Sequence, residues 1–155
     1  MLHELARRGF RIVPEAARAV LQEEGGLALR AEDPDGFAAA ILECEIVRFA
    51  EAEGYQGVVF FDRGLGDLAS MPVRSDALRQ KIADMVSELR YCNPVFRAPA
   101  WRAIYRQDEE RTQSWEEAVA SDNAVRSAWR GAGYDIVDLP LVTPSERASF
   151  ILRHL

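Results

Sequence analysis

The sequence predicts an α/β protein built on a doubly wound parallel sheet with helices on both faces. Short apolar stretches suited to buried strands alternate with segments that carry helix-capping residues and apolar residues at helical spacing. Internal repeats, low-complexity tracts and Pro/Ser-rich linkers are absent from the sequence. Alternating strands and helices favour parallel strands joined by helical crossovers, so we expect residues 1–155 to form a single domain.

The composition is typical of a cytoplasmic globular protein. Of the 155 residues, 48% are hydrophobic, which is enough to bury a core. No apolar stretch approaches the length of a membrane span, and the N-terminal residues are polar and charged, unlike a secretory signal. The net charge of −6 argues against a nucleic-acid surface. Cys44 and Cys92 lack metal-type spacing, so we expect reduced thiols.

Four segments have the character of strands. The clearest is 58–61, a continuous apolar stretch with two β-branched residues, which indicates a strand buried on both faces. The expected strands are 10–13, 58–61, 95–96 and 134–139.

Capping residues locate the helices. Asp33 followed by Pro34 is a typical helix start, and Ser114 and Thr143 each stand three positions before a glutamate, the spacing of a capping box. The expected helices are 2–8, which ends at Gly9, 34–53, 76–91 after Ser75, 115–130, and a last helix from Pro144 through Leu152.

The segment Asp62-Arg63-Gly64 directly follows the expected strand 58–61. In doubly wound sheets, ligands bind at the carboxyl ends of the strands. A carboxylate there can hold Mg²⁺ through water, and an adjacent guanidinium can bind a phosphate in a bidentate way. The same residues would also suit a turn whose charges are solvated, but the apolar strand before them favours the functional interpretation.

Glu15 lies at another expected strand end, after 10–13, and Arg18 follows three residues later. If residues 16–21 are helical, the two side chains share a face. The Glu15 carboxylate could then accept a proton from a substrate hydroxyl. On these residues alone, a surface helix start with an ordinary ion pair is the favoured interpretation.

Segment 105–113 mixes arginines with acids, and Arg106 and Arg111 are its basic residues. Arginines on a closing lid commonly stabilise charge on transferred phosphoryl groups. A charge run is more often a solvated face, and on its own this segment favours that interpretation.

Several motifs in order resemble one family. They are Leu-Ala-Arg-Arg-Gly-Phe-Arg-Ile-Val-Pro-Glu-Ala-Ala-Arg at 5–18, Val-Phe-Phe-Asp-Arg-Gly at 59–64, Asn-Pro-Val-Phe at 93–96, Ala-Pro-Ala-Trp at 98–101, Asp-Glu-Glu-Arg-Thr-Gln-Ser-Trp-Glu-Glu-Ala at 108–118 and Ser-Glu-Arg at 145–147. The chain resembles a P-loop NTPase of the AAA-type ATPase domain family that includes the NadR-type kinase domain. The resemblance covers nearly the whole sequence.

The resemblance implies a three-layer fold with a five-stranded parallel sheet that binds ATP and Mg²⁺ at its carboxyl edge. It implies an acceptor that is a small molecule, similar to a nucleoside or nucleotide. The implied roles are Asp62 as the acid on the Mg²⁺ side, Arg63 as a phosphate or substrate contact, Glu15 and Arg18 facing the acceptor, Arg106 and Arg111 in the lid, and Pro140, Leu141, Val142 and Thr143 near the adenine.

One departure from the family pattern is large. Family members open with a strand, central in the sheet, and a Gly-x-x-x-x-Gly-Lys-Ser/Thr loop, neither of which occurs here. The only lysine, Lys81, lies in the expected helix 76–91 with no glycines before it. We therefore expect an N-terminally truncated P-loop ATPase or small-molecule kinase domain that is inactive in this form. The alternative is a degenerate, non-catalytic binding or regulatory domain.

Overall fold

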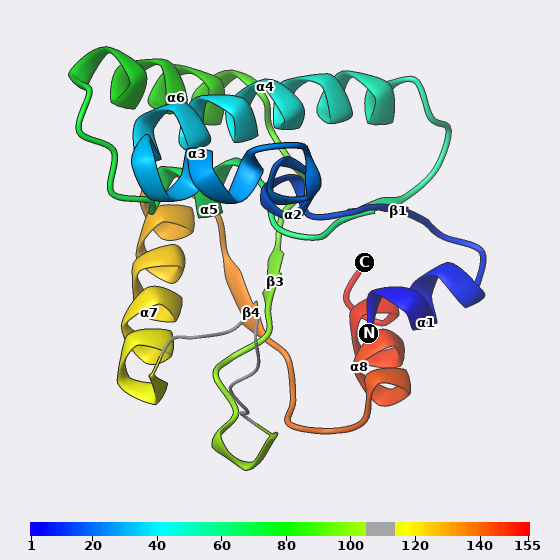
Figure 1. Cartoon of the computed structure of the whole chain (residues 1–155). Coiled ribbons are helices and arrows are strands. Elements are labelled where there is room, and N and C mark those ends of the chain that lie inside the picture. The colour runs from blue at the N-terminus through cyan, green and yellow to red at the C-terminus, as the bar shows by residue number, and fades with distance from the viewer. Residues whose placement is uncertain (105–113) are drawn as a thin grey trace. The chain divides into compact units, whose positions relative to one another are not determined.

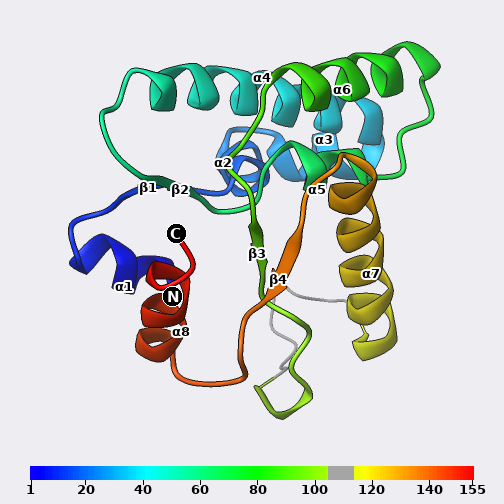
Figure 2. The ribbon, with the colours of Figure 1, turned by 180° about the vertical axis from the view of Figure 1, so that it is seen from behind.

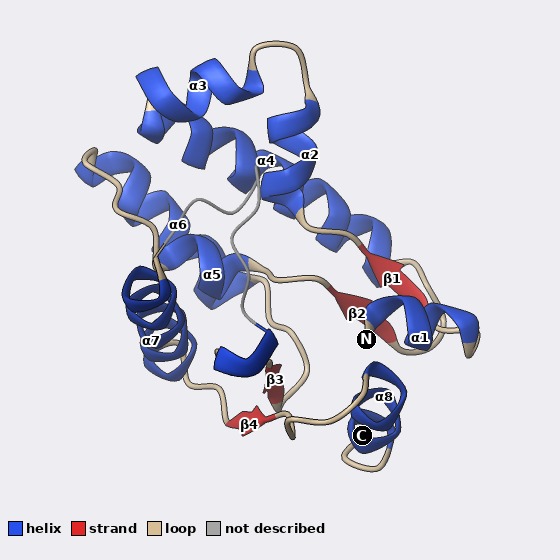
Figure 3. Ribbon diagram, turned by 60° about the horizontal axis from the view of Figure 1, so that its bottom comes forward, coloured by secondary structure: helices blue, strands red, loops and turns tan. Residues whose placement is uncertain are grey.

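The computed structural model describes residues 1–104 and 114–155 of the chain. These residues divide into two compact units, Leu2–Tyr91 and Cys92–Leu155, the second together with Met1. Helices make up most of the first unit, and the strands of both units are short (Figure 3). Within the described ranges, no helix is both long and apolar enough to cross a membrane.

The first unit contains one pair of parallel strands, β1 (Figure 1) and β2 (Figure 3). Their bounds are Arg11–Val13 and Val59–Phe61. The ladder continues for one further step, because the backbone N–H of Asp62 donates to the carbonyl of Val13 at 2.8 Å. The two expected strands are confirmed, each starting one residue later than predicted, and the residues after them meet at one edge.

The helices of the first unit pack on one another around an apolar core. Helices α2 and α3 contact α4, and α5 contacts both α4 and α6. The bounds are α1 Leu2–Arg7, α2 Ala16–Gln22, α3 Gly26–Glu32, α4 Pro34–Glu53, α5 Leu65–Ala69 and α6 Asp76–Glu88. The buried core residues are Ala16, Val20, Phe37, Ala38, Ile41, Leu42, Leu65, Leu68 and Ile82. The core thus includes Leu65 and Leu68 of α5, the helix that follows β2.

The start of α4 agrees with the prediction in detail. The Asp33 carboxylate accepts a hydrogen bond from Gly36 N–H at 2.9 Å, and Pro34 occupies the first helical turn. Two short helices, α3 and α5, are not predicted from the sequence. Each begins beside a glycine, and Gly25, with φ 79°, is the residue that turns the chain into α3.

The second unit contains the other parallel pair, β3 and β4, with α7 packed against β4 (Figure 2). The bounds are β3 Val95–Arg97, a 3₁₀ turn Arg102–Ile104, α7 Trp115–Gly131, β4 Ile136–Asp138 and α8 Pro144–Leu152. Both predicted capping boxes, Ser114 with Glu117 and Thr143 with Glu146, are confirmed.

An arginine at the end of β3 ties this unit together. Arg97 donates from Nε and Nη2 to the two carboxylate oxygens of Asp122 on α7, at 2.8 and 2.6 Å. Its Nη1 donates to Asp138 at the end of β4, at 2.8 Å. The pKa of Arg97 lies above its usual value because the hydrogen bond to Asp122, followed by that to Asp138, outweighs burial. The bidentate pair therefore joins a strand to a helix, and the third hydrogen bond of Arg97 joins them to a second strand.

Aromatic side chains pack close to arginines in the second unit. The guanidinium of Arg102 lies 5.1 Å from the ring centre of Trp115, and that of Arg147 lies 5.3 Å from that of Trp101. Trp129 is buried and meets Tyr134 edge-on, with ring centres 5.0 Å apart.

The strands of the described ranges form two separate two-stranded sheets, so the single doubly wound sheet predicted from the sequence is not formed among them. The parallel direction of each pair is confirmed. The three-layer arrangement stays a prediction.

Candidate functional site

The carboxyl edge of β1 and β2 brings together residues that are far apart in sequence. Glu15 follows β1 and is the N-cap residue of α2, and Arg63 follows β2. The Nε of Arg63 lies 2.9 Å from Oε1 of Glu15, so the two form an ion pair. Parallel pairing of the strands explains the contact, because it places both chain exits at the same edge.

Arg63 is held in an unusual backbone conformation. Its φ of 71° lies in the left-handed region, which a non-glycine residue enters at a cost on the order of 1 kcal/mol. Its Nη1 also lies 3.4 Å from Oδ1 of Asp67 on α5. Burial by itself would lower the Arg63 pKa, but the carboxylates of Glu15, Asp67 and Asp62 raise it above the usual value. Arg63 is therefore a firmly charged cation between two carboxylates.

Asp62 stands at the same edge with its side chain exposed. Within residues 1–104 and 114–155 its carboxylate forms no hydrogen bond or ion pair, and no group of three or more potential metal-ligating side chains is present. Mg²⁺ commonly binds through one or two carboxylates while keeping several waters. A single exposed acid at a strand end fits that mode, and it does not fit an ion bound only by protein ligands.

Three further residues are predicted for this site. Arg18 lies on α2 and is exposed. Arg106 and Arg111, predicted to belong to a lid, lie outside the described residues. The edge of β1 and β2 therefore gathers Glu15, Asp62 and Arg63.

The sequence interpretation missed Glu45, a buried acid close to this edge. Its side chain is 4% exposed on α4, and burial raises its pKa to about 7, with Asp67 and Glu15 contributing in the same direction against Arg48. Arg48, in turn, donates to the carbonyl of Pro14 at 2.6 Å. A signal was present, since Glu45 occupies a position on the apolar face of its helix, four residues after Ile41 and four before Phe49.

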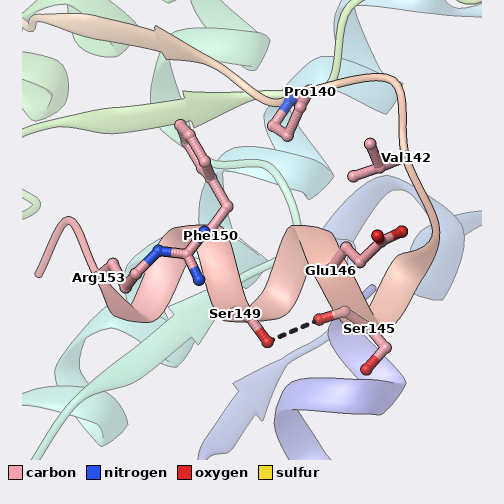
Figure 4. A pocket seen from close by; sticks show the side chains of 7 residues that line it. All are labelled: Pro140, Val142, Ser145, Glu146, Ser149, Phe150 and Arg153. Carbon is pink, nitrogen blue, oxygen red and sulfur yellow. Dashed lines mark hydrogen bonds between the residues drawn. The ribbon is translucent and has the colours of Figure 1, made fainter.

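The predicted adenine loop 140–143 lies in the second unit, between β4 and α8, beside a shallow cavity of about 400 Å³. Figure 4 shows its lining side chains projecting from this loop and from α8. They are Pro140, Val142, Ser145, Glu146, Ser149, Phe150 and Arg153. Leu141 is 51% exposed and does not line the cavity, and Thr143 caps α8. Only two of the four predicted residues therefore face it.

Arg147 fixes the start of this loop. Its Nε donates to the carbonyl of Pro140 at 2.8 Å while its guanidinium packs over Trp101. Its Nη2 is buried and has no hydrogen-bond partner in the described part of the chain. The loop is thus held by an arginine that retains one unused donor.

Parallel strand pairs packed with helices, with an acid and an arginine at a carboxyl edge, define an α/β domain whose strand ends are the expected place for a ligand. Comparison with protein families matches residues 1–147 to an AAA domain family. The chain belongs to this AAA-type family of P-loop NTPase-like domains, which indicates a nucleotide-binding function of the ATPase or kinase kind. Neither the comparison with curated proteins nor that with solved structures found a match.

Proposed function

We propose that this domain is part of an ATP-dependent kinase that phosphorylates a small molecule similar to a nucleoside or nucleotide. The observation that carries the proposal is the meeting of Glu15, Asp62 and Arg63 at the carboxyl edge of β1 and β2 in a chain of the AAA domain family. Phosphoryl transfer needs an acid for Mg²⁺, a cation for phosphate and a base for the acceptor, and these three side chains have those chemistries.

Asp62 is the residue that would hold Mg²⁺, through water, because its carboxylate is exposed and unpaired within the described ranges. The ion would neutralise charge on phosphate oxygens. Arg18, Arg106 and Arg111 are proposed as further cations facing the acceptor or the phosphates, as the family resemblance implies.

Arg63 and Glu15 would act as a pair. With Glu15 at 2.9 Å and Asp67 at 3.4 Å, the Arg63 guanidinium is already oriented along the edge. An incoming phosphate competes with these two carboxylates for the guanidinium. When Arg63 turns to the phosphate, Glu15 is released and can accept the proton of the acceptor hydroxyl.

The cavity beside loop 140–143 is proposed to receive the adenine. Pro140, Val142 and Phe150 supply apolar lining, and Ser145 and Ser149 on α8 supply hydroxyl groups (Figure 4). A flat base with polar edges suits a shallow cavity of this kind.

The 155-residue chain does not by itself fit the phosphates of ATP. A Gly-x-x-x-x-Gly-Lys loop, whose backbone N–H groups and lysine bind the β- and γ-phosphates, does not occur in its sequence. Each charge-assisted hydrogen bond lost with the loop contributes about 1.5–3 kcal/mol, so the loss of several lowers the rate by many factors of ten. We propose that the functional protein supplies this loop from residues outside the 155, and that the 155-residue chain alone is inactive.

The test compares two proteins, the 155-residue chain and a longer one that includes any in-frame sequence encoded upstream of Met1. Calorimetry measures binding of ATP with Mg²⁺, and an ADP-release assay measures turnover. We expect binding and turnover only in the longer protein, and we expect Asp62→Asn to abolish its turnover. ADP release without a small-molecule acceptor would indicate an ATPase.

Two outcomes would contradict the proposal. Micromolar ATP binding and steady turnover by the short chain would mean that other residues carry the chemistry. Absence of any upstream coding sequence, together with no ATP hydrolysis, would favour the degenerate binding or regulatory domain.

A further inference from the structure

Tyr91, the last residue of the first unit, touches the turn Asp62-Arg63-Gly64 on both of its sides. Its ring meets the ring of Phe61, the residue before the turn, edge-on at 5.1 Å. Its hydroxyl oxygen accepts a hydrogen bond from the backbone N–H of Leu65, the residue after the turn, at 3.4 Å. Tyr91 thus contacts the turn where it begins and where it ends.

The hydroxyl of Tyr91 is itself held by Glu45, the buried acid of α4. It donates to Oε2 of Glu45 at 3.4 Å, while the Tyr91 ring also packs edge-on against Phe49 at 5.2 Å. Glu45 and Phe49 lie four residues apart on α4, so one helix face holds both the ring and its hydroxyl. A chain of two hydrogen bonds therefore runs from the core of α4 through Tyr91 to Leu65.

These two hydrogen bonds matter to the site because they end beside the turn Asp62-Arg63-Gly64. Arg63 has the left-handed φ of 71°, and such a conformation persists only where the surrounding structure enforces it. The contacts on either side, at Phe61 and Leu65, are restraints of that kind. The Tyr91 hydroxyl bonds to Glu45 and to the backbone of Leu65, so Glu45 and Tyr91 act on Asp62 and Arg63 through the backbone of the turn.

We propose that Tyr91 and Glu45 are positioning residues, which hold the turn Asp62-Arg63-Gly64 in the conformation that presents its acid and its guanidinium at the strand edge. The functional meaning of this role rests on the proposed function, whereas the coupling itself does not. The charged groups that act on the Glu45 carboxyl are Arg48 on its own helix, Asp67 on α5 and Glu15 before α2. Through its two hydrogen bonds, Tyr91 couples the charge state of Glu45 to the Leu65 amide.

The test uses nuclear magnetic resonance on the 155-residue chain, with no nucleotide present. The Glu45 side-chain carboxyl carbon and the Leu65 amide are followed from pH 5 to pH 9 in the native chain, in Tyr91→Phe and in Glu45→Gln. In the native chain both signals should change with a shared midpoint near 7. In Tyr91→Phe the carboxyl should still titrate but the Leu65 amide should not follow it, and in Glu45→Gln the Leu65 transition should vanish.

Hydrogen exchange gives a second measure of positioning. In Tyr91→Phe the Leu65 amide loses its acceptor and should exchange about tenfold faster, and the Arg63 Nε–H, held by Glu15, should also exchange faster. Tyr55→Phe is the matched control, because Tyr55 lies in the same unit, is 42% exposed and stacks with Arg11. It should leave both exchange rates unchanged.

If Tyr91→Phe folds normally and its Leu65 amide keeps the native exchange rate and pH profile, the proposal is overturned. A failure of the proposed function looks different. It would appear as no ATP binding by the longer protein, while the coupling between Glu45, Tyr91 and Leu65 is intact.

Discussion

At the scale of single residues, burial keeps the Glu45 carboxyl protonated up to neutral pH. Its pKa of about 7 in the folded chain compares with an ordinary value of 4.5. The folded state therefore binds more protons than the unfolded state between these values. The stability linked to this group is fully present below pH 4.5 and is lost as the pH rises through 7.

This linkage predicts a fall of about 3 kcal/mol in the free energy of unfolding between pH 5 and pH 8. Glu45→Gln should flatten the profile and be more stable than the native chain at pH 8. Urea denaturation followed by circular dichroism at four pH values measures it. Glu43→Gln is the control, since Glu43 is exposed on the same helix and pairs with Lys81, and it should keep the native slope. Equal slopes in the native chain and Glu45→Gln would contradict the prediction.

The left-handed backbone of Arg63 gives a second prediction for a single residue. Arg63→Gly and Arg63→Ala both remove the guanidinium, so their difference isolates the backbone. Because Gly accepts a φ of 71° without a steric cost, Arg63→Ala should be less stable than Arg63→Gly by about 1 kcal/mol.

The matched control for Arg63 lies within α2. At Arg18 the helix favours alanine over glycine, so the order should reverse, with Arg18→Gly less stable by about 1 kcal/mol. Urea midpoints of the four variants decide the matter. If alanine were the more stable substitution at both positions, the left-handed conformation of Arg63 would be wrong.

At the scale of secondary-structure elements, Arg97 connects β3 with α7 and β4. The side chains of Arg97 and Asp122 are 15% and 18% exposed, whereas Asp138 is 48% exposed. Breaking a largely buried pair leaves an uncompensated charge, while an exposed pair contributes little. Asp122→Asn should therefore cost about 3 kcal/mol of unfolding free energy and Asp138→Asn less than about 1 kcal/mol.

Denaturation of the two variants in parallel measures this difference. Replacing both Arg97 and Asp122 by leucine should recover much of the loss, because the partner then left without Arg97 is Asp138, whose side chain is 48% exposed. Similar losses in Asp122→Asn and Asp138→Asn would show that the bidentate contact is not the main tie between these elements.

Elements with local signals could be predicted from the sequence. The starts of α4, α7 and α8 follow from Asp33, Ser114 and Thr143, whose side chains bond to backbone groups only three residues away. Helices α3 and α5 could not, because packing against α4 and α6 stabilises short helices beside glycines that local propensity disfavours.

The candidate site divides in the same way. Glu15 and Arg63 could be expected to meet because both follow strands that pair in parallel. Asp67 could not be assigned without α5, and the contact of Glu45 with Tyr91 joins positions 46 residues apart. Contacts of that kind depend on tertiary packing, which no local pattern encodes.

At the scale of the whole molecule, the proposed function leads to a prediction about ligand-linked stability. A ligand that binds only the folded state at 100 times its dissociation constant stabilises it by about 2.7 kcal/mol. For a domain of this size that corresponds to a rise of roughly 5–10 °C in Tm. ATP with Mg²⁺ should produce such a shift in the longer protein defined above and none in the 155-residue chain.

Differential scanning calorimetry of both proteins, with and without nucleotide, measures this shift. AMP serves as the control ligand, since it lacks the β- and γ-phosphates that a Gly-x-x-x-x-Gly-Lys loop would bind. An equal shift with ATP in the short chain would contradict the requirement for residues outside it.

The distribution of tryptophan and tyrosine between the two units also gives them different fluorescence. All three tryptophans of the chain, Trp101, Trp115 and Trp129, lie in the unit Cys92–Leu155, and the other unit has two tyrosines, Tyr55 and Tyr91, and no tryptophan. Fluorescence excited above the tyrosine absorption band therefore reports on one unit alone. A single unlabelled sample can thus reveal whether the indole emission and the far-ultraviolet signal of all the helices change together on unfolding.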